Sequence, residues 1–184
     1  MNKYILVILC LITLTAFTQS KFKPVLRVGV NNSSITKITS NNGMAYFLGL
    51  AYPVKISSNK SMQIELVYES LVTKTKESSN KIKIDFVTAT LNFNILKKNK
   101  FNALGGTFVS VLTSQNFSQY SPGFIDLTPN LDAGLFLGIG YNILPNLNSD
   151  LRYKIGFIDV INMRDDIYNN QTRMLQLGIN YKFN

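Results

Sequence analysis

The sequence predicts an all-β fold, an eight-stranded antiparallel up-and-down barrel that spans a membrane. Three observations predict it: repeated segments in which apolar and polar residues alternate, connections whose lengths alternate along the chain, and apolar faces too large for the interior of a small barrel. Alternation with a period of two residues places one face of a strand in an apolar medium and the other in a polar or tightly packed one.

Eight segments carry this alternation. In chain order they are 24–32, 43–54, 62–74, 81–96, 101–114, 130–143, 150–161 and 172–183. The sixth is the clearest, because Leu135, Leu137 and Ile139 face one way while the small residues Gly134 and Gly138 face the other. A tilted strand needs about 9–11 residues to cross the hydrocarbon core, so these segments have the right length.

The fourth segment changes phase within its length. Ile82, Ile84 and Phe86 are apolar at even positions, whereas Val87 and Leu91 are apolar at odd positions. A β-bulge inserts one extra residue into a strand and so shifts the face on which later side chains lie. We therefore expect a bulge near Phe86–Val87.

The connections between the segments run long and short in turn. The short ones are 55–61, 97–100 and 144–149, and the longer ones, rich in Asn, Ser and Thr, are 32–42, 75–80, 115–129 and 162–171. Outer-membrane barrels have tight periplasmic turns and longer external loops. The longer connections are therefore predicted to lie together at the external end of the barrel.

The apolar faces are predicted to point outward to lipid. The interior of an eight-stranded barrel is just wide enough for side chains to fill it, and these apolar residues would overfill it. The polar, glycine-rich faces then line the lumen, and the charged side chains on them are expected to pair there: Arg27, Glu65, Glu69, Asp132, Arg152 and Lys154. Tyr and Phe near the strand ends fit an interfacial aromatic girdle.

The first residues have the layout of a secretory signal peptide. Lys3 supplies a positive charge, and residues 4–12 form an apolar run too short to span a bilayer. Residues 1–18 are therefore predicted to be a signal peptide that is cleaved after Thr18 or Ser20, and residues 19–184 to be the barrel domain.

Composition excludes several kinds of chemistry. The chain has 184 residues, a net charge of +9, no His and a single Cys, which lies within the predicted leader. Ser-His and Cys-His catalysis and His-bearing zinc sites are therefore excluded, and we expect no enzyme activity, no cofactor, no metal and no nucleic-acid partner. Basic residues on or beside the longer connections are expected to meet lipopolysaccharide phosphates. They are Lys37, Lys74, Lys76, Arg164 and Arg173.

Four stretches of the mature chain resemble the PorT-like outer-membrane β-barrel family of Bacteroidota. They are RVGVNNS, MQIELVYES, LDAGLFLGIGYNILPNLNSDLRYKIGFIDVIN and LQLGINYKFN, in the order of the family. The resemblance implies a barrel in the bacterial outer membrane that is inserted by the barrel assembly machinery. It also implies that Tyr181 and Phe183 in the last strand carry the recognition signal, although Asn184 follows and leaves the aromatic residue penultimate. The role of the family's namesake in type IX secretion is not carried over.

Together these observations predict a small, monomeric, non-enzymatic outer-membrane barrel with a structural or adaptor role. Its external loops are the expected contact surface for a protein partner, chiefly loop 115–129, which contains Phe117, Tyr120 and Phe124. Two alternatives stay open: a narrow channel or transporter, and a soluble lipocalin-like carrier whose apolar faces point inward.

Overall fold

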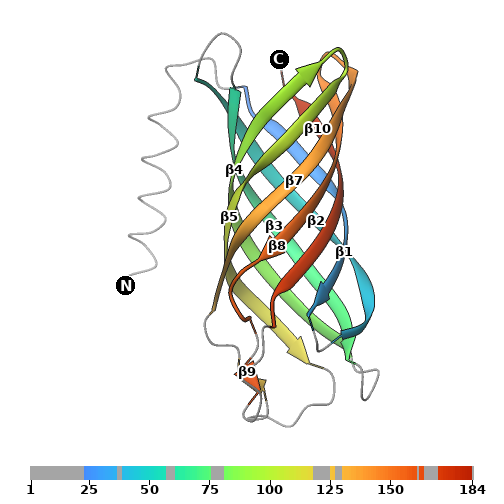
Figure 1. Ribbon diagram of the computed structural model, residues 1–184, viewed down its shortest axis with the longest axis vertical. Coiled ribbons are helices and arrows are strands. Elements are labelled where there is room, and N and C mark those ends of the chain that lie inside the picture. Colours follow the sequence, from blue (N-terminus) through green and yellow to red (C-terminus); the bar gives the residue numbers. More distant parts are fainter. Residues whose placement is uncertain are drawn as a thin grey trace.

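The computed structural model describes residues 23–36, 39–56, 61–75, 81–117, 125–126, 130–160, 162–163 and 170–183. Eight long strands form a closed barrel in the order β1-β10-β8-β7-β5-β4-β3-β2 (Figure 1). They are β1 (Val25–Ile35), β2 (Thr39–Lys55), β3 (Ser61–Thr75), β4 (Lys81–Lys98), β5 (Phe101–Phe117), β7 (Leu131–Leu144), β8 (Leu147–Gly156) and β10 (Thr172–Lys182). Every neighbouring pair is antiparallel, so the predicted fold class is confirmed.

Closure joins the first barrel strand to the last. β1 pairs with β10 in one unbroken register, from Val25 opposite Lys182 to Ile35 opposite Thr172. A closed sheet leaves no strand edge with free backbone groups, which is the condition for a sheet in hydrocarbon. Two short strands, β6 (Ile125–Asp126) and β9 (Asn162–Met163), pair with each other in a separate sheet within the longest connections. Among the described residues, no helix is long and apolar enough to cross a membrane.

The predicted long connection 32–42 is wrong. β1 continues to Ile35 and β2 begins at Thr39, so most residues of the predicted connection belong to strands. The side chain of Asn31 donates a hydrogen bond to the carbonyl of Ser70 (2.9 Å), and the hydroxyl of Ser33 donates one to the carbonyl of Val72 (3.1 Å). Ser33 therefore marks an inward-facing strand position within the predicted connection, and Asn31 marks one at the end of the predicted segment 24–32.

Two further strand boundaries differ from the prediction. The segment predicted as 150–161 is shifted, because β8 begins at Leu147 and ends at Gly156. β5 continues three residues beyond its predicted end at position 114, to Phe117. The tight connections keep their predicted place between β4 and β5 and between β7 and β8, and we call this the short-turn end of the barrel. We call the opposite end the loop end.

The bulge predicted near Phe86–Val87 does not change the phase of β4. Ile82, Ile84 and Phe86 are buried inside the barrel, and Val87, the next residue, is exposed on its outside. Even positions therefore point inward along this whole part of β4. The irregularity belongs to β5, where the extra residue Thr113 shifts the register between the two strands. Apolar residues occupy both faces of β4 because the barrel interior is itself apolar at the loop end.

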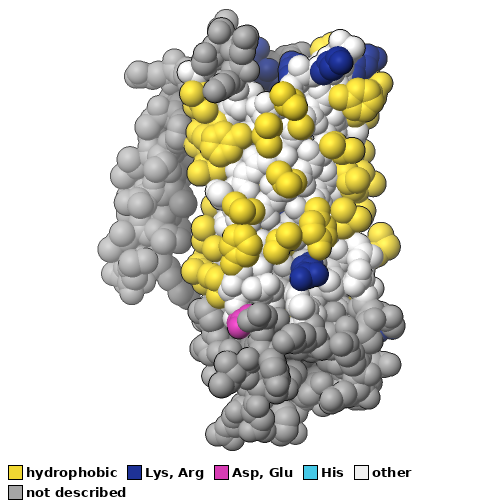
Figure 2. Space-filling view, viewed as in Figure 1, with side chains coloured by type: hydrophobic (Ala, Val, Ile, Leu, Met, Phe, Trp, Pro, Cys, Tyr) yellow, Lys and Arg dark blue, Asp and Glu magenta, His cyan; other side chains and the backbone are white. Residues whose placement is uncertain are grey.

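The outer wall of the barrel is apolar on every strand. Leu66, Leu137 and Ile139 expose 60%, 68% and 59% of their surface, and Figure 2 shows hydrophobic side chains along the barrel wall. A water-soluble protein rarely exposes contiguous apolar patches of more than a few hundred Å². This arrangement contradicts the alternative of a soluble lipocalin-like carrier, because the large apolar side chains face away from the axis.

Candidate functional site

The barrel interior has three layers along its axis. An apolar plug fills the loop end, a layer of paired charges lies in the middle, and an amide-lined cavity lies at the short-turn end. The plug consists of buried residues that contact one another: Ile35, Leu71, Ile82, Ile84, Phe86, Val160 and Met174. Val160 comes from the chain that follows β8, where its backbone N–H donates to the carbonyl of Asn170 (3.3 Å).

Two arginines and two carboxylates form the first part of the charged layer. Arg152 from β8 binds Glu65 from β3 through both ends of its guanidinium, with Nη1–Oε2 and Nη2–Oε1 distances of 2.7 and 3.0 Å. Arg27 from β1 reaches Asp150 through an Nη2–Oδ1 contact of 2.9 Å, and Arg152 Nε lies 3.0 Å from the same oxygen. Paired, planar contacts of this kind are the strong form of a charged hydrogen bond.

Lys154 and Glu69 form the second part of the layer. The Nζ of Lys154 lies 2.5 Å from Oε1 of Glu69, which also accepts a hydrogen bond from the hydroxyl of Thr88 (2.7 Å). The other oxygen of Glu69 accepts from Nε2 of Gln176 (2.6 Å). Glu69 is therefore bound by groups from three other strands, β4, β8 and β10.

Aromatic rings cover the buried cations. The guanidinium carbon of Arg27 lies 4.3 Å from the ring centre of Phe47, and the Nζ of Lys154 lies 4.3 Å from that of Phe108. A cation over an aromatic face is attracted by the ring quadrupole, and the attraction grows when water is excluded. Each of these cations therefore has a carboxylate on one side and a ring on another.

The charged residues singled out in the sequence are brought together, with one exception. Arg27, Glu65, Glu69, Arg152 and Lys154 all lie in the charged layer. The sixth, Asp132, is buried elsewhere in the lumen, where it accepts a hydrogen bond from the Thr172 hydroxyl (2.5 Å). Asp150 belongs to the layer and was missed. The sequence pattern could have identified it, because Asp150 lies two residues before Arg152 and four before Lys154, on the same face of the strand.

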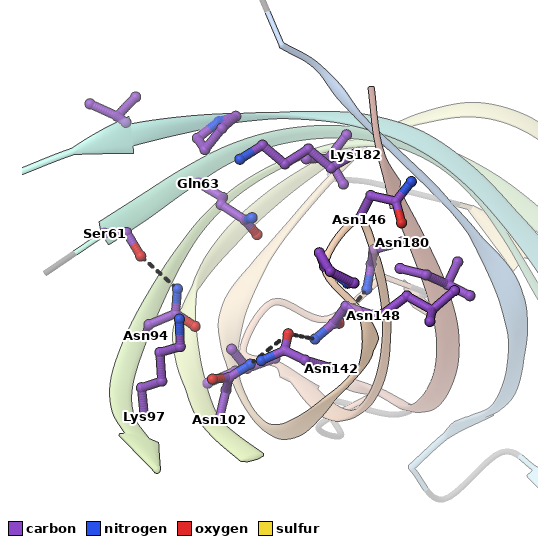
Figure 3. A pocket seen from close by; sticks show the side chains of 17 residues that line it. Ser61, Gln63, Asn94, Lys97, Asn102, Asn142, Asn146, Asn148, Asn180 and Lys182 are labelled. Carbon is purple, nitrogen blue, oxygen red and sulfur yellow. Dashed lines mark hydrogen bonds between the residues drawn. The ribbon is translucent and has the colours of Figure 1, made fainter. Parts of the chain in front are cut away.

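The cavity at the short-turn end has a volume of about 410 Å³ and receives residues from all eight barrel strands. We call it the amide vestibule, after the side chains that point into it (Figure 3). Its polar lining consists of Ser61, Gln63, Asn94, Asn102, Asn142, Asn146, Asn148 and Asn180, with Lys97 and Lys182. This site is not predicted from the sequence.

A chain of amides runs along one side of the vestibule. The Nδ2 of Asn148 donates to Oδ1 of Asn142 (3.0 Å), and the Nδ2 of Asn180 donates to Oδ1 of Asn148 (3.0 Å). The Nδ2 of Asn180 also donates to Asp150 (2.5 Å), so this chain ends in the charged layer. The Oδ1 of Asn102 is buried and accepts no hydrogen bond from the residues that the structure describes. Buried polar atoms usually have a partner, so the acceptor capacity of Asn102 is left unused among the described residues.

Other predicted contact residues fall in two places. Tyr181 and Phe183 lie at the outer surface of the short-turn end with their rings edge to face, 5.1 Å between centres. Lys74 and Arg173 are exposed at the loop end of their strands. The side chains of Phe117, Tyr120 and Phe124, and also those of Lys37, Lys76 and Arg164, lie outside the described residues. In the described part of the chain, no group of His, Cys, Asp or Glu side chains is arranged to hold a metal ion.

Comparison with solved structures finds the same fold in outer-membrane proteins. Neisserial surface protein A shares 17% identity at a TM-score of 0.53, over 89% of this chain and 98% of that one. The outer-membrane protein OprG of Pseudomonas aeruginosa shares 15% identity at a TM-score of 0.50, over 88% and 96% of the two chains. No family model matches the chain, and no curated protein does.

The fold, the apolar outer wall and an interior filled by side chains define a class. An antiparallel barrel with an outward apolar band and aromatic residues at its margins is the architecture of bacterial outer-membrane proteins. The chain is therefore an eight-stranded transmembrane β-barrel of the bacterial outer membrane.

Proposed function

We propose that this barrel is a small, monomeric, non-enzymatic component of the outer membrane with a structural or adaptor role, and that it does not conduct. The filled interior carries this proposal. Ions entering from the loop end would meet the apolar plug, and beyond it the buried pairs Arg152–Glu65 and Lys154–Glu69. An eight-stranded barrel has little interior space beyond what its side chains fill. Transport through the lumen would require both layers to rearrange.

Planar-bilayer recording tests this function against the alternative of a narrow channel. The purified protein is expected to leave the current at the level of the lipid alone, because no continuous water path crosses the plug and the charged layer. Heat-modifiable migration on a gel verifies that the same preparation is folded. Discrete single-channel steps from folded wild-type protein would contradict the proposal and favour a channel.

The adaptor role places partner contacts on the external loops. The connection predicted as 115–129, whose first three residues belong to β5, is proposed as the contact tip because its aromatic residues, Phe117, Tyr120 and Phe124, can offer large apolar area to a partner. Replacing all three by Ser is expected to abolish capture of a crosslinked partner on intact cells without changing the amount of folded barrel. Equal crosslinking by the variant and the wild type would show that these aromatic residues do not contact the partner.

Basic residues near the loop end are proposed to contact lipopolysaccharide. Lys74 and Arg173 are exposed there, which supports a role in meeting lipid phosphates. Replacing both by Gln, together with Lys37, Lys76 and Arg164, is expected to weaken lipopolysaccharide binding to the purified barrel. Unchanged binding by this variant would exclude these residues as the contact.

Three further proposals concern assembly and origin. Residues 1–18 act as a cleaved leader, which N-terminal sequencing of the mature protein would test. Tyr181 and Phe183 serve as the signal for the barrel assembly machinery, supported by their exposed rings at the end of the last strand. Replacing both by Ala should lower the amount of folded barrel in the outer membrane. Membership of the PorT-like family of Bacteroidota rests on the four sequence stretches that resemble that family.

A further inference from the structure

The amide vestibule has the dimensions of a ligand site. Its volume of about 410 Å³ falls in the range of about 300–1,000 Å³ that small-molecule pockets occupy. The turn residues Pro145 and Asn146 line it, so it opens at the short-turn end, which faces the periplasm in an outer-membrane barrel. The charged layer forms its inner limit, through the contact between Asn180 and Asp150. It is therefore a cup with one mouth, which receives the end of a molecule.

The lining of the amide vestibule is suited to a ligand that carries amide groups. Side-chain amides contributed by β3, β4, β5, β7, β8 and β10 present N–H donors and carbonyl acceptors at several angles (Figure 3). Peptide groups carry the same donor and acceptor pair, so an extended peptide matches such a lining. Asn102 lines the cavity and its buried Oδ1 accepts nothing from the described residues, so a rotation of this side chain would present an unused acceptor to a ligand N–H. The cup is lined by no Phe or Tyr in the described part of the chain, and it lacks the aromatic platform on which a sugar ring would stack.

The charged residues at the amide vestibule favour a ligand with a negatively charged end. Lys97 from β4 and Lys182 from β10 stand on different sides of the cavity (Figure 3). Among the described residues that line it there is no Asp or Glu to neutralise them. Two ammonium groups facing one cavity favour a negative group between them, and a carboxylate bound to Lys gains the strength of a charge-assisted hydrogen bond.

We propose that the amide vestibule binds the carboxylate-terminated end of a peptide, with Lys97 and Lys182 holding the carboxylate and the Asn side chains holding the peptide groups. Two periplasmic sources offer this chemistry: the stem peptides of the cell wall, which end in D-residues, and the C-terminal tails of proteins, which end in L-residues. The site lies at the end of the barrel opposite the external loops. It therefore goes beyond the adaptor role, and neither the conductance nor the loop experiments bear on it.

Fluorescence anisotropy with the full mature barrel in lipid nanodiscs tests the proposal. The probes are fluorescein-labelled alanine tetrapeptides with a free C-terminal carboxylate or with a C-terminal amide. The free carboxylate is expected to bind about tenfold or more tightly than the amide, which is the size of effect that a hydrogen bond to a charged group produces. Equal binding of the two probes, or binding of neither, would overturn the proposal, and so would tighter binding of an uncharged oligosaccharide.

Charge-matched variants locate the site. The double variant K97Q/K182Q is expected to lose about tenfold or more in affinity for the free-carboxylate probe. The control K98Q/K100Q removes the same charge from the same end of the barrel, where neither residue lines the vestibule, and should bind like the wild type. An equal loss in both variants would show that net charge alone attracts the probe, and would overturn the site.

Variant N102L tests the amide lining without changing charge. Asn102 supplies the unpartnered oxygen. Its loss should weaken binding of the free-carboxylate probe, while the barrel keeps its heat-modifiable migration. Unchanged affinity of a folded N102L barrel would contradict the assignment of the amides. The source then follows from a probe ending in D-Ala. Tighter binding of that probe would identify the stem peptides of the cell wall as the source of the ligand, and tighter binding of the probe ending in L-Ala would identify the C-terminal tails of proteins.

Discussion

The Lys154–Glu69 contact shows, at the scale of single residues, how the interior is held together. Both side chains are buried, and their charged atoms lie 2.5 Å apart. The variant Lys154→Met leaves Glu69 without its cation, and stranding one partner of a buried pair costs about 3–5 kcal/mol. We expect that loss in the free energy of unfolding, measured by urea titration of the barrel in lipid vesicles.

The double variant E69Q/K154M is the control for this residue-scale prediction. It removes both charges, so no buried ion is left without a partner. In the wild type the Thr88 hydroxyl donates to Oε1 of Glu69 at 2.7 Å, and the carbonyl oxygen of a neutral Gln can accept the same hydrogen bond. It should therefore be more stable than K154M alone, because the effects of substitutions at two interacting residues on the free energy of unfolding are not additive. A double variant that loses the sum of the two single losses would mean that the two charges do not interact.

At the scale of the element, the glycines of β7 differ in what surrounds them. A Cβ added at Gly134 would lie 2.8 Å from the ring of Phe108 and would overlap the carbonyl oxygen of Ile155. One added at Gly140 meets only ordinary contacts, the nearest at 3.4 Å from Asn148. Overpacking costs about 1–3 kcal/mol. Gly134→Ala should lower the free energy of unfolding by that amount, whereas Gly140→Ala should leave it nearly unchanged.

These two variants share one strand and one face, so each controls the other. Both are inward-facing positions of β7, and both substitutions carry the same change in backbone entropy. Urea titration and the fraction of heat-modifiable protein measure the outcome. If Gly140→Ala proved as destabilising as Gly134→Ala, the cause would be the glycine backbone itself, and close packing between β7 and β8 would not explain it.

The element scale also shows what alternation in a sequence can predict. The period-two pattern locates all eight barrel strands because lipid on one side and a polar lumen on the other impose opposite demands. It misled at β4, where Ile84 and Phe86 point into an apolar plug, so that the polarity of the inner face changes along one strand. It also misled at Ser33, since a polar side chain that bonds to another strand inside the barrel resembles that of a loop.

At the scale of the whole molecule, the interior depends on closure. The charged residues could be expected to meet because they alternate with lipid-facing residues on their own strands. The amide vestibule could not be predicted in this way. Asn94, Asn102 and Asn180 lie at the ends of different strands, and their side chains converge only because the closed barrel sets the register of one strand against the next. Single asparagines near turns carry no signal of that convergence.

The placement of the whole barrel in a bilayer gives a prediction that depends on depth. Leu137 lies midway along the outer face of β7, and Ile143 lies on the same face next to the short turn. A Lys or Arg on the lipid face costs about 2–4 kcal/mol at the midplane and about 0–1 near the interface. Leu137→Arg should therefore destabilise the barrel in lipid vesicles by about 2–4 kcal/mol, and Ile143→Arg by no more than about 1 kcal/mol.

Urea titration in vesicles measures both variants, and the thickness of the bilayer supplies the control. The same charged residue enters the same strand face in each case, so the main difference between the two variants is the depth of the new charge. In detergent micelles without a fixed hydrocarbon thickness, the difference between the two variants should shrink. Equal losses for Leu137→Arg and Ile143→Arg in vesicles would mean that the apolar outer wall does not face acyl chains, and the membrane-spanning orientation of the barrel would be wrong.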